Sequence, residues 1–95
     1  MDDYFEWDLA KEDQNILKHN LSFKKAKKAF YDNKRVILED LSHSTLEQRY
    51  FCLGRVGKFV ITVRFTYRNN KIRIFGAGYW RKGKKYYEKY NKIYK

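Results

Sequence analysis

The sequence predicts an α+β fold, in which two N-terminal helices cover one face of an antiparallel sheet of about four strands and a C-terminal helix completes the domain. Apolar and polar residues alternate along 58–67 and again along 71–79, as expected of strands with one face on a core. Helix-capping residues and apolar residues at helical spacing occupy the first third of the chain. The 95 residues contain no proline and no internal repeat, so we expect a single domain spanning 1–95.

The N-terminal third carries the signals of one short strand and two helices. Phe5 to Trp7 is an apolar run typical of an edge strand. Asp8 is suited to cap a helix that ends near His19, and Asn20 tolerates the left-handed conformation that often follows a helix. Ser22 is suited to cap a second helix. The residues at helical spacing are Leu9, Asp13, Ile16 and Leu17 in the first helix and Phe23, Ala26, Ala29 and Phe30 in the second.

Two further strands are expected in the middle of the chain. They are residues 35–40 and 47–53, separated by a polar loop, and a turn at 54–57 leads into the next strand. If that turn has an even number of residues, Arg49 lies on the same sheet face as Thr62. An odd loop with a bulge would place Arg49 on the opposite face.

The turn between the last two strands fixes their register. Asn69-Asn70 is a two-residue hairpin turn, because both central residues must accept positive φ and asparagine tolerates it. Thr66 then faces Arg73, and Arg68 faces Lys71. One face is expected in the core and carries Phe59, Ile61, Val63, Phe65, Tyr67, Ile72 and Ile74. The opposite face, named the cationic face here, carries Thr62, Arg64, Thr66, Arg68, Lys71 and Arg73. Such a face is suited to hold an anion.

A basic, tyrosine-rich segment follows Tyr79. Tyr86, Tyr90 and Tyr94 recur at helical spacing with Tyr87 beside them, which predicts an amphipathic helix that packs on the domain. We expect the helices to leave the cationic face uncovered.

Composition narrows the class of partner. A formal charge of +11, from 22 Lys+Arg against 11 Asp+Glu, favours a polyanion such as nucleic acid, an anionic membrane surface or an acidic protein. Cys52 is the one cysteine, so there is no intrachain disulfide, and we expect it in the core. Two histidines and one cysteine cannot form a zinc site of the usual spacing, and we expect no metal and no cofactor. No signal peptide or apolar span is visible, which predicts a cytoplasmic protein.

The candidate catalytic residues combine a histidine, arginines and a hydroxyl. They are His19, Arg49, Thr66, Arg68 and Arg73. RNA carries its own nucleophile, the 2′-hydroxyl, so cleavage needs a proton acceptor, a proton donor and positive charge around the phosphorane. Arginine pairs with phosphate through its planar fork, and histidine titrates near neutrality. This signal alone is weak, because a histidine at a helix end is more often a capping residue.

Several segments match one known family in order along residues 4–79. They are Phe5-Glu-Trp-Asp8, Lys18-His19, Leu21-Ser-Phe23, Ala29-Phe-Tyr-Asp32, Glu47-Gln-Arg49, Phe65-Thr-Tyr-Arg68 and Lys71-Ile-Arg-Ile74. In these segments the chain resembles the BrnT family of type II toxins, relatives of the RelE/ParE superfamily. The resemblance implies a RelE-like fold and a small ribonuclease. It also points to the five candidate catalytic residues, of which the strand argument had selected all but His19.

The resemblance also implies the partners. These are single-stranded RNA as substrate, a cognate ribbon-helix-helix antitoxin (BrnA-like) that holds the toxin inactive, and operator DNA bound only through that antitoxin. No membrane is implied. We expect additional RNA contacts from Arg64, Lys71, Arg81 and Lys82. His43 matches a family position, but its place between two serines in a polar loop favours a turn residue. For Glu47 two roles stay open: a structural pair with Arg64 across the hairpin, or a carboxylate near the site that orients an arginine or acts as a base.

The chain departs from the family pattern most clearly at the end of its last strand. Gly76-Ala77-Gly78 stands where the family has Ser-Ala-Arg, so an arginine of the family's site is missing at Gly78. Arg81 is one candidate to replace it, and a weakened or inactive toxin is the alternative. The function we expect is a metal-independent endoribonuclease toxin that cleaves mRNA and inhibits translation. Two rivals stay open: a non-catalytic nucleic-acid-binding or degenerate toxin acting through its antitoxin complex, and a ParE-like topoisomerase inhibitor.

Overall fold

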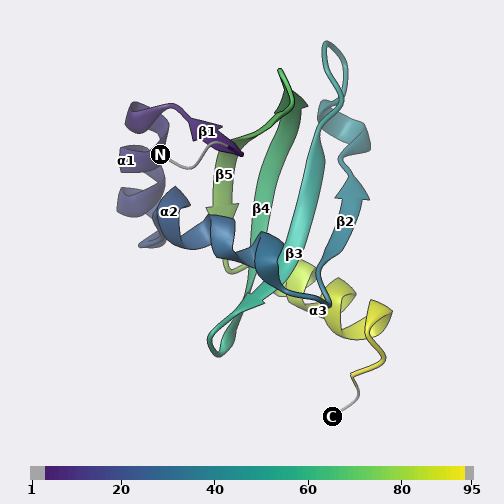
Figure 1. Ribbon diagram of the computed structural model, residues 1–95. Helices are drawn as coiled ribbons and strands as arrows, with labels where there is room; N and C mark the ends of the chain where they lie inside the picture. The colour runs from purple at the N-terminus through teal and green to yellow at the C-terminus, as the bar shows by residue number, and fades with distance from the viewer. Residues whose placement is uncertain (1–3, 94–95) are drawn as a thin grey trace.

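A computed structural model describes residues 4–93 and contains one five-stranded mixed sheet in the order β1-β5-β4-β3-β2 (Figure 1). The strands are β1 (Phe5–Trp7), β2 (Val36–Glu39), β3 (Tyr50–Val56), β4 (Phe59–Arg68) and β5 (Lys71–Gly78). The helices are α1 (Leu9–His19), α2 (Phe23–Ala26) and α3 (Arg81–Tyr90), with 3-10 turns η1 (Lys27–Tyr31) and η2 (Leu41–His43). The α+β class is confirmed.

The predicted edge strand at Phe5–Trp7 is confirmed as β1, which makes five strands where a sheet of about four antiparallel strands was expected. β1 joins it by pairing parallel to β5, with Glu6 opposite Arg73. The local pattern predicts the strand but not its partner, because β5 lies far along the chain, so the parallel pairing was not visible in the sequence.

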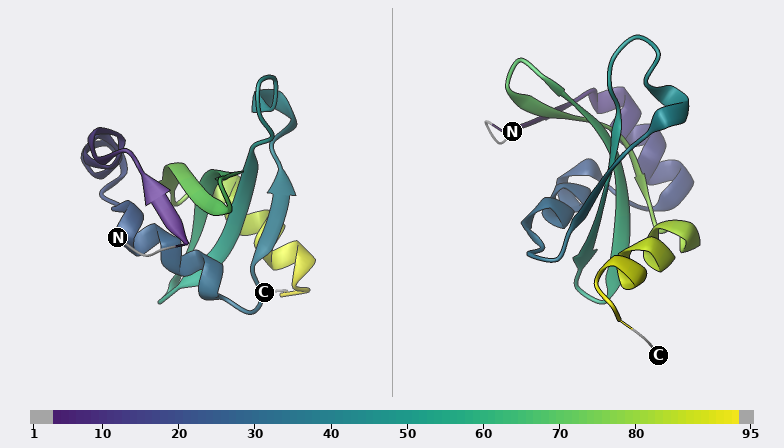
Figure 2. Two further views of the ribbon diagram at one scale, coloured as in Figure 1. Left: turned by 45° about the horizontal axis from the view of Figure 1, so that its top comes forward. Right: turned by 90° about the vertical axis from the view of Figure 1, so that its right-hand side faces the viewer.

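The helices lie on both sides of the sheet, as the edge-on view in Figure 2 shows. α2 and η1 pack on one face, α3 packs on the other against β3 and β4, and α1 packs beside β5. The expectation that both N-terminal helices share one face was therefore wrong for α1. The expectation that the cationic face is uncovered was also wrong, because α3 lies over one end of it. None of the helices in residues 4–93 is long and apolar enough to cross a lipid bilayer.

α1 begins and ends as predicted but packs through a different side. Asp8 accepts hydrogen bonds from the N–H groups of Ala10 and Lys11, and Asn20 is left-handed at φ 52°. Leu9 and Leu17 are exposed, and Asn15 is the buried residue of the helix. Its side-chain amide donates to the carbonyls of Leu21 and Ala77, and its oxygen accepts from the N–H of Ala77. The open edge of β5 needs polar partners, which the apolar residues of α1 cannot supply.

The β4–β5 hairpin has the predicted register. Asn69 and Asn70 have φ of 53° and 63°, and Thr66 pairs with Arg73. The preceding turn lies three residues later than predicted, because β3 continues to Val56 and Gly57, at φ 61°, begins the two-residue turn. Gly54 is instead inside β3, where a Cβ would collide with the carbonyl of Ala29.

The main core lies between the sheet and α2 with η1. It contains Phe5, Leu21, Phe23, Ala26, Ala29, Cys52, Ile61, Val63, Phe65, Ile74 and Ala77. Cys52 is fully buried as predicted, and burial raises the pKa of its thiol to about 12, so it is an inert core residue. Phe59 and Tyr67, expected in the core, are more than half exposed because they lie toward the two ends of β4, beyond the residues that form the core.

α3 is held on the opposite face by Tyr87, which is buried against Leu53 and Val60. The Tyr87 hydroxyl donates to Asp32 Oδ2 at 2.6 Å. Tyr86 and Tyr90, expected on the packing side, are 38% and 59% exposed, and Tyr94 lies outside the described residues. The helix is thus rotated so that Tyr87, which is bonded to a half-buried carboxylate, faces the sheet in place of the regular tyrosine stripe.

Candidate active site

A pocket of about 280 Å³ opens on the cationic face between α1 and the β2–β3 connection. Its basic side chains are Lys11, Lys18, Arg49 and Arg64, and both histidines of the chain also line it. Asp40 is the one carboxylate among the lining residues. The volume lies near the lower limit of about 300 Å³ for small-molecule sites, so the pocket is suited to a small anionic group rather than a large ligand.

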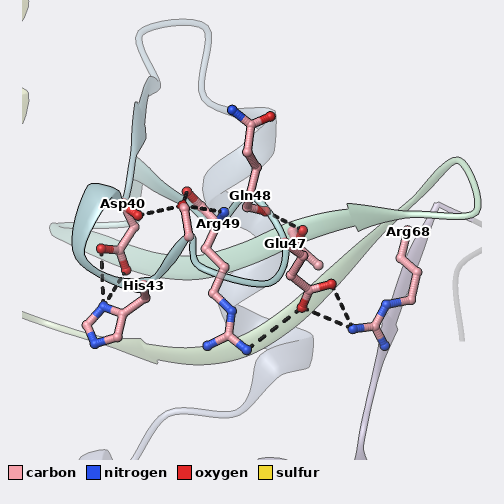
Figure 3. A network of polar contacts seen from close by, with 8 residues as sticks. Asp40, His43, Glu47, Gln48, Arg49 and Arg68 are labelled. Atoms are coloured by element: carbon pink, nitrogen blue, oxygen red, sulfur yellow. Dashed lines mark hydrogen bonds and ion pairs between the residues drawn. The ribbon is translucent and has the colours of Figure 1, made fainter.

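His43 is held in the pocket by a buried carboxylate. Its Nδ1 lies 2.9 Å from Oδ2 of Asp40, which is 4% exposed. With Nδ1 hydrogen-bonded to the carboxylate, Nε2 remains available for proton transfer. Figure 3 shows the His43 ring and the Arg49 guanidinium extending to the same side of the β2–β3 connection.

Backbone and serine hydrogen bonds close the loop that carries these residues (Figure 3). The N–H of Asp40 donates to the carbonyl of Arg49 at 2.7 Å. The Ser44 hydroxyl donates to the Asp40 carbonyl and accepts from the N–H of Arg49. Thr66, buried on β4, donates from its hydroxyl to the carbonyl of Gln48 at 2.5 Å. The loop is therefore fixed at its base and along its return to β3.

Arg49 is positioned by an aromatic ring. Its guanidinium carbon lies 4.3 Å from the centre of the Phe75 ring, within the range of a cation–π contact. Phe75 is the extra residue of a bulge in β5, since Arg64 pairs with Gly76 and the next residue of β4 pairs with Ile74. Bulges re-aim side chains near functional sites, and here the bulge places Phe75 at the pocket.

Arg64 lies across a glycine of the neighbouring strand. A Cβ on Gly76 would be 2.8 Å from Nη2 of Arg64, so the guanidinium occupies space that only glycine leaves free. Arg64 forms no ion pair with a carboxylate among residues 4–93.

His19 lies in the last turn of α1 and contacts Trp80 edge to face, with ring centres 5.6 Å apart. The Trp80 ring in turn lies over Gly78, where a Cβ would be 2.9 Å from it. The family pattern has an arginine where this chain has Gly78. The indole beside His19 thus occupies the space next to that position.

Three of the sequence-predicted catalytic residues lie outside this pocket. Arg68 pairs with Glu47 at 3.1 Å, and Arg73 pairs with Glu6 at 3.0 Å. Thr66 is buried and bonded to backbone as described. The structure brings His19 and Arg49 together with Arg64, which had been assigned to RNA binding alone. Their catalytic roles remain predictions.

The predicted RNA-binding residues other than Arg64 also lie outside the pocket. Lys71 is exposed beside the hairpin turn, and Arg81 and Lys82 are exposed at the start of α3, outside the pocket. Glu47, expected beside Arg64, contacts Arg68 and more distantly Arg49, at 3.8 Å. Sequence reasoning treated His43 as a turn residue; the acid three residues before it was the available signal for an oriented imidazole.

Residues 4–93 contain no group of three or more His, Cys, Asp or Glu side chains that could hold a metal ion. No curated protein sequence is similar enough to this chain to be matched with it. The model of one protein family, described as the ribonuclease toxin BrnT of type II toxin–antitoxin systems, matches residues 7–83, which is most of the chain. The chain therefore belongs to the BrnT family of ribonuclease toxins.

Proposed function

We propose that this chain is an endoribonuclease toxin that cleaves single-stranded regions of mRNA through the 2′-hydroxyl and so inhibits translation. The observation that carries the proposal is the pocket itself, where two imidazoles and two guanidinium groups converge from α1, the β2–β3 connection and β4. One of the imidazoles is oriented by a buried carboxylate.

Each group has one role in the proposed reaction. His43, oriented by Asp40, takes the proton of the 2′-hydroxyl, whose oxygen then attacks phosphorus. His19 gives a proton to the departing 5′-oxygen. Arg49 and Arg64 stabilise the negative charge that grows on the non-bridging oxygens. The bond to the 5′-oxygen breaks as the bond from the 2′-oxygen forms, leaving a 2′,3′-cyclic phosphate.

Arg64 supports the proposal that the enzyme is active despite Gly78. Arg81, the replacement suggested by the sequence, lines a separate groove, whereas Arg64 borders the pocket with both histidines. A guanidinium is thus available for the phosphate without an arginine at the end of β5.

The roles of the histidines can be tested by RNA cleavage. We expect His43→Gln to lower cleavage by about 10²–10⁴-fold, the usual contribution of an acid–base group. Asp40→Asn should also lower it, since the amide favours the wrong tautomer of His43. The matched control is Gln48→Ala in the same loop. An RNA with a 2′-deoxy residue at the cut site should resist cleavage; cutting of that substrate would rule out the mechanism.

We also propose that the reaction is metal-independent, because protein groups are in place for both proton transfers and for charge stabilisation. Cleavage should persist in EDTA. Loss of activity on chelation, with recovery on adding magnesium, would contradict this part of the proposal.

The type II toxin–antitoxin family implies a protein antitoxin as partner. We propose a BrnA-like ribbon-helix-helix protein that covers the cationic face with an acidic or carbonyl-rich segment and alone contacts operator DNA. Binding should weaken steeply with salt. Hydrogen exchange in the complex should show protection within residues 62–73; protection limited to α1 and α2 would contradict the proposed interface.

Two assays separate this function from its rivals. Cell-free translation should be inhibited, and DNA supercoiling by gyrase should be unaffected. The opposite pattern would favour a ParE-like topoisomerase inhibitor. Binding of RNA without any cleavage would favour a degenerate toxin that acts through its antitoxin complex. The proposed RelE-like relationship is supported by the α+β order of elements.

A further inference from the structure

A second and larger cavity, named the aromatic groove here, lies next to the pocket on the same side of the sheet. It has a volume of about 920 Å³ and runs between α3 and the β2–β3 half of the sheet. Its ring-bearing walls are Phe51, Trp80, Tyr86 and Tyr90. At this size it lies within the range of about 300–1,000 Å³ typical of sites for small organic groups.

Trp80 lines the groove and contacts His19, which lines the pocket. Its indole lies against Gly78 and is in a T-shaped contact with the ring of His19, yet 37% of the residue is exposed. Tyr86 is exposed to nearly the same degree, at 38%. Large aromatic residues held by their neighbours and still open to solvent offer flat surfaces for stacking.

The two cavities are neighbours that share a lining residue. Asp40 lines both, and Trp80 lines the groove while contacting His19 of the pocket. A ligand with an anionic group in the pocket and a flat apolar group beside it would fill both. Arg81 and Lys82 line the groove as well and can contact phosphate, whereas the carboxylates of the lining, Asp40 and Glu39, are bonded to His43 and Gln48.

We propose that the aromatic groove binds a base of single-stranded RNA next to the phosphate held in the pocket, with the base stacked on Trp80 or Tyr86. Nucleotides combine a phosphate with a flat ring, and stacking on aromatic side chains tolerates any base. Ser42 and Glu39, also in the lining, offer polar groups to the edge of that base. The inference rests on the proposed function for its class of ligand and adds a second subsite to it.

Fluorescence of Trp80 tests the proposal directly. The chain has two tryptophans, so Trp7→Phe leaves Trp80 as the single tryptophan, which can be excited selectively over the tyrosines. The probe is a short 2′-O-methyl RNA of mixed sequence, which cannot be cleaved through the 2′-hydroxyl. We expect it to quench Trp80 on binding. A series of probes with one abasic residue at successive positions should lose quenching and affinity at one position only.

Substitutions at Trp80 and Gly78 test whether binding of the probe depends on the indole. Trp80→Ala should weaken binding of the intact probe by about 5- to 100-fold, the effect of losing one base–aromatic stack, and Trp80→Phe should recover most of it. Gly78→Ala keeps the indole but places a Cβ against it, and should also weaken binding. Tyr67→Ala, an exposed tyrosine on the opposite sheet face, is the control and should bind normally.

The outcomes separate this inference from the proposed function. If RNA is bound and cleaved but no abasic position matters, or Trp80→Ala binds normally, the groove does not hold a base. If an antitoxin quenches Trp80 and the probe does not, the groove belongs to the protein partner and the inference is overturned. If Trp80 is quenched with one critical position but RNA is never cleaved, the base subsite stands and the catalytic proposal fails.

Discussion

The two ends of the cationic face carry the same kind of side chain and differ in what surrounds it. At the pocket end, Arg49 and Arg64 border a cavity whose one lining carboxylate, Asp40, is already bonded to His43. At the hairpin end, both arginines have a carboxylate within 3.1 Å. Strand alternation places all of these arginines on one face, but only those at the pocket end surround a cavity that a phosphate could enter.

The carboxylates at the hairpin end come from elements that are distant from the hairpin in the sequence. Glu6 reaches the hairpin from β1, and Glu47 reaches it from the β2–β3 connection. Such pairs neutralise charge locally and hold neighbouring segments together. A cationic residue on a face is therefore the better candidate for a ligand group when no carboxylate lies close to it: Glu47 is 3.1 Å from Arg68 but 3.8 Å from Arg49.

The strongest test of this comparison is one conservative substitution at each end. We expect Arg49→Lys to lower RNA cleavage by roughly 10²-fold, because lysine cannot reproduce the planar fork around a phosphorane. Arg68→Lys should leave cleavage nearly unchanged. Single-turnover cleavage and thermal melting of both variants provide the measurement. Equal losses of cleavage at the two sites would show that the ion-paired arginine also contacts the substrate.

A rise in pH should weaken the contact between Tyr87 and Asp32 that holds α3 on the sheet. Burial, together with the Asp32 carboxylate, raises the pKa of Tyr87 to about 12. Because this pKa is raised on folding, the stabilisation is fully present below about pH 10, the unfolded value, and is lost as pH rises toward the folded value. Tyr87→Phe should cost about 1.5–3 kcal/mol of unfolding free energy near neutrality, and the difference in melting temperature should shrink above about pH 10.

The same contact predicts a loss of stability in acid. Burial raises the pKa of the Asp32 carboxyl, but hydrogen bonds from the Tyr87 hydroxyl and from the N–H groups of Arg55 and Lys34 outweigh it and leave the pKa below its ordinary value. The stabilisation is therefore present above about pH 4 and is lost as pH falls through the lowered pKa. Asp32→Asn should remove this acid dependence. An unchanged acid profile in the variant would mean that other carboxylates dominate it.

The smallest expected effect concerns the pair between β1 and β5. Glu6→Gln should lower the unfolding free energy by about 1 kcal/mol or less, as for a partly exposed ion pair, and leave cleavage nearly unchanged. Arg73→Lys should behave similarly. A large loss of cleavage in Arg73→Lys, with the melting temperature unchanged, would support the catalytic role that the sequence suggested for Arg73. The hairpin end of the cationic face would then contribute to catalysis as the pocket end does.

Features determined by neighbouring residues could be predicted from the sequence. The caps at Asp8, Asn20 and Ser22 depend on local hydrogen bonds, and the hairpin register follows from Asn69-Asn70. The position of Arg49 was predicted conditionally, since any even turn keeps it on the face of Thr62. The β3–β4 turn does have an even number of residues, although it lies later than expected.

Features that depend on distant partners could not be predicted in this way. The parallel strand β1 and the side chain of Asn15 in α1 both bond to backbone groups at the edge of β5. Local periodicity does not reveal that this edge needs partners. The contact between His43 and Asp40 was not predicted, because the two side chains meet only when the loop is closed. Gly54 suggested a turn, although it instead permits close approach of η1.

The amide of Asn15 has a consequence for association between copies of the chain. Strand edges with free N–H and C=O groups can pair with other strands and promote aggregation. β1 covers β5 only as far as Ile74, and Asn15 occupies both backbone groups of Ala77 beyond it. The Asn15 side chain thus occupies the backbone groups to which a further strand could have bonded. The β5 edge is therefore closed to pairing with a strand of another molecule.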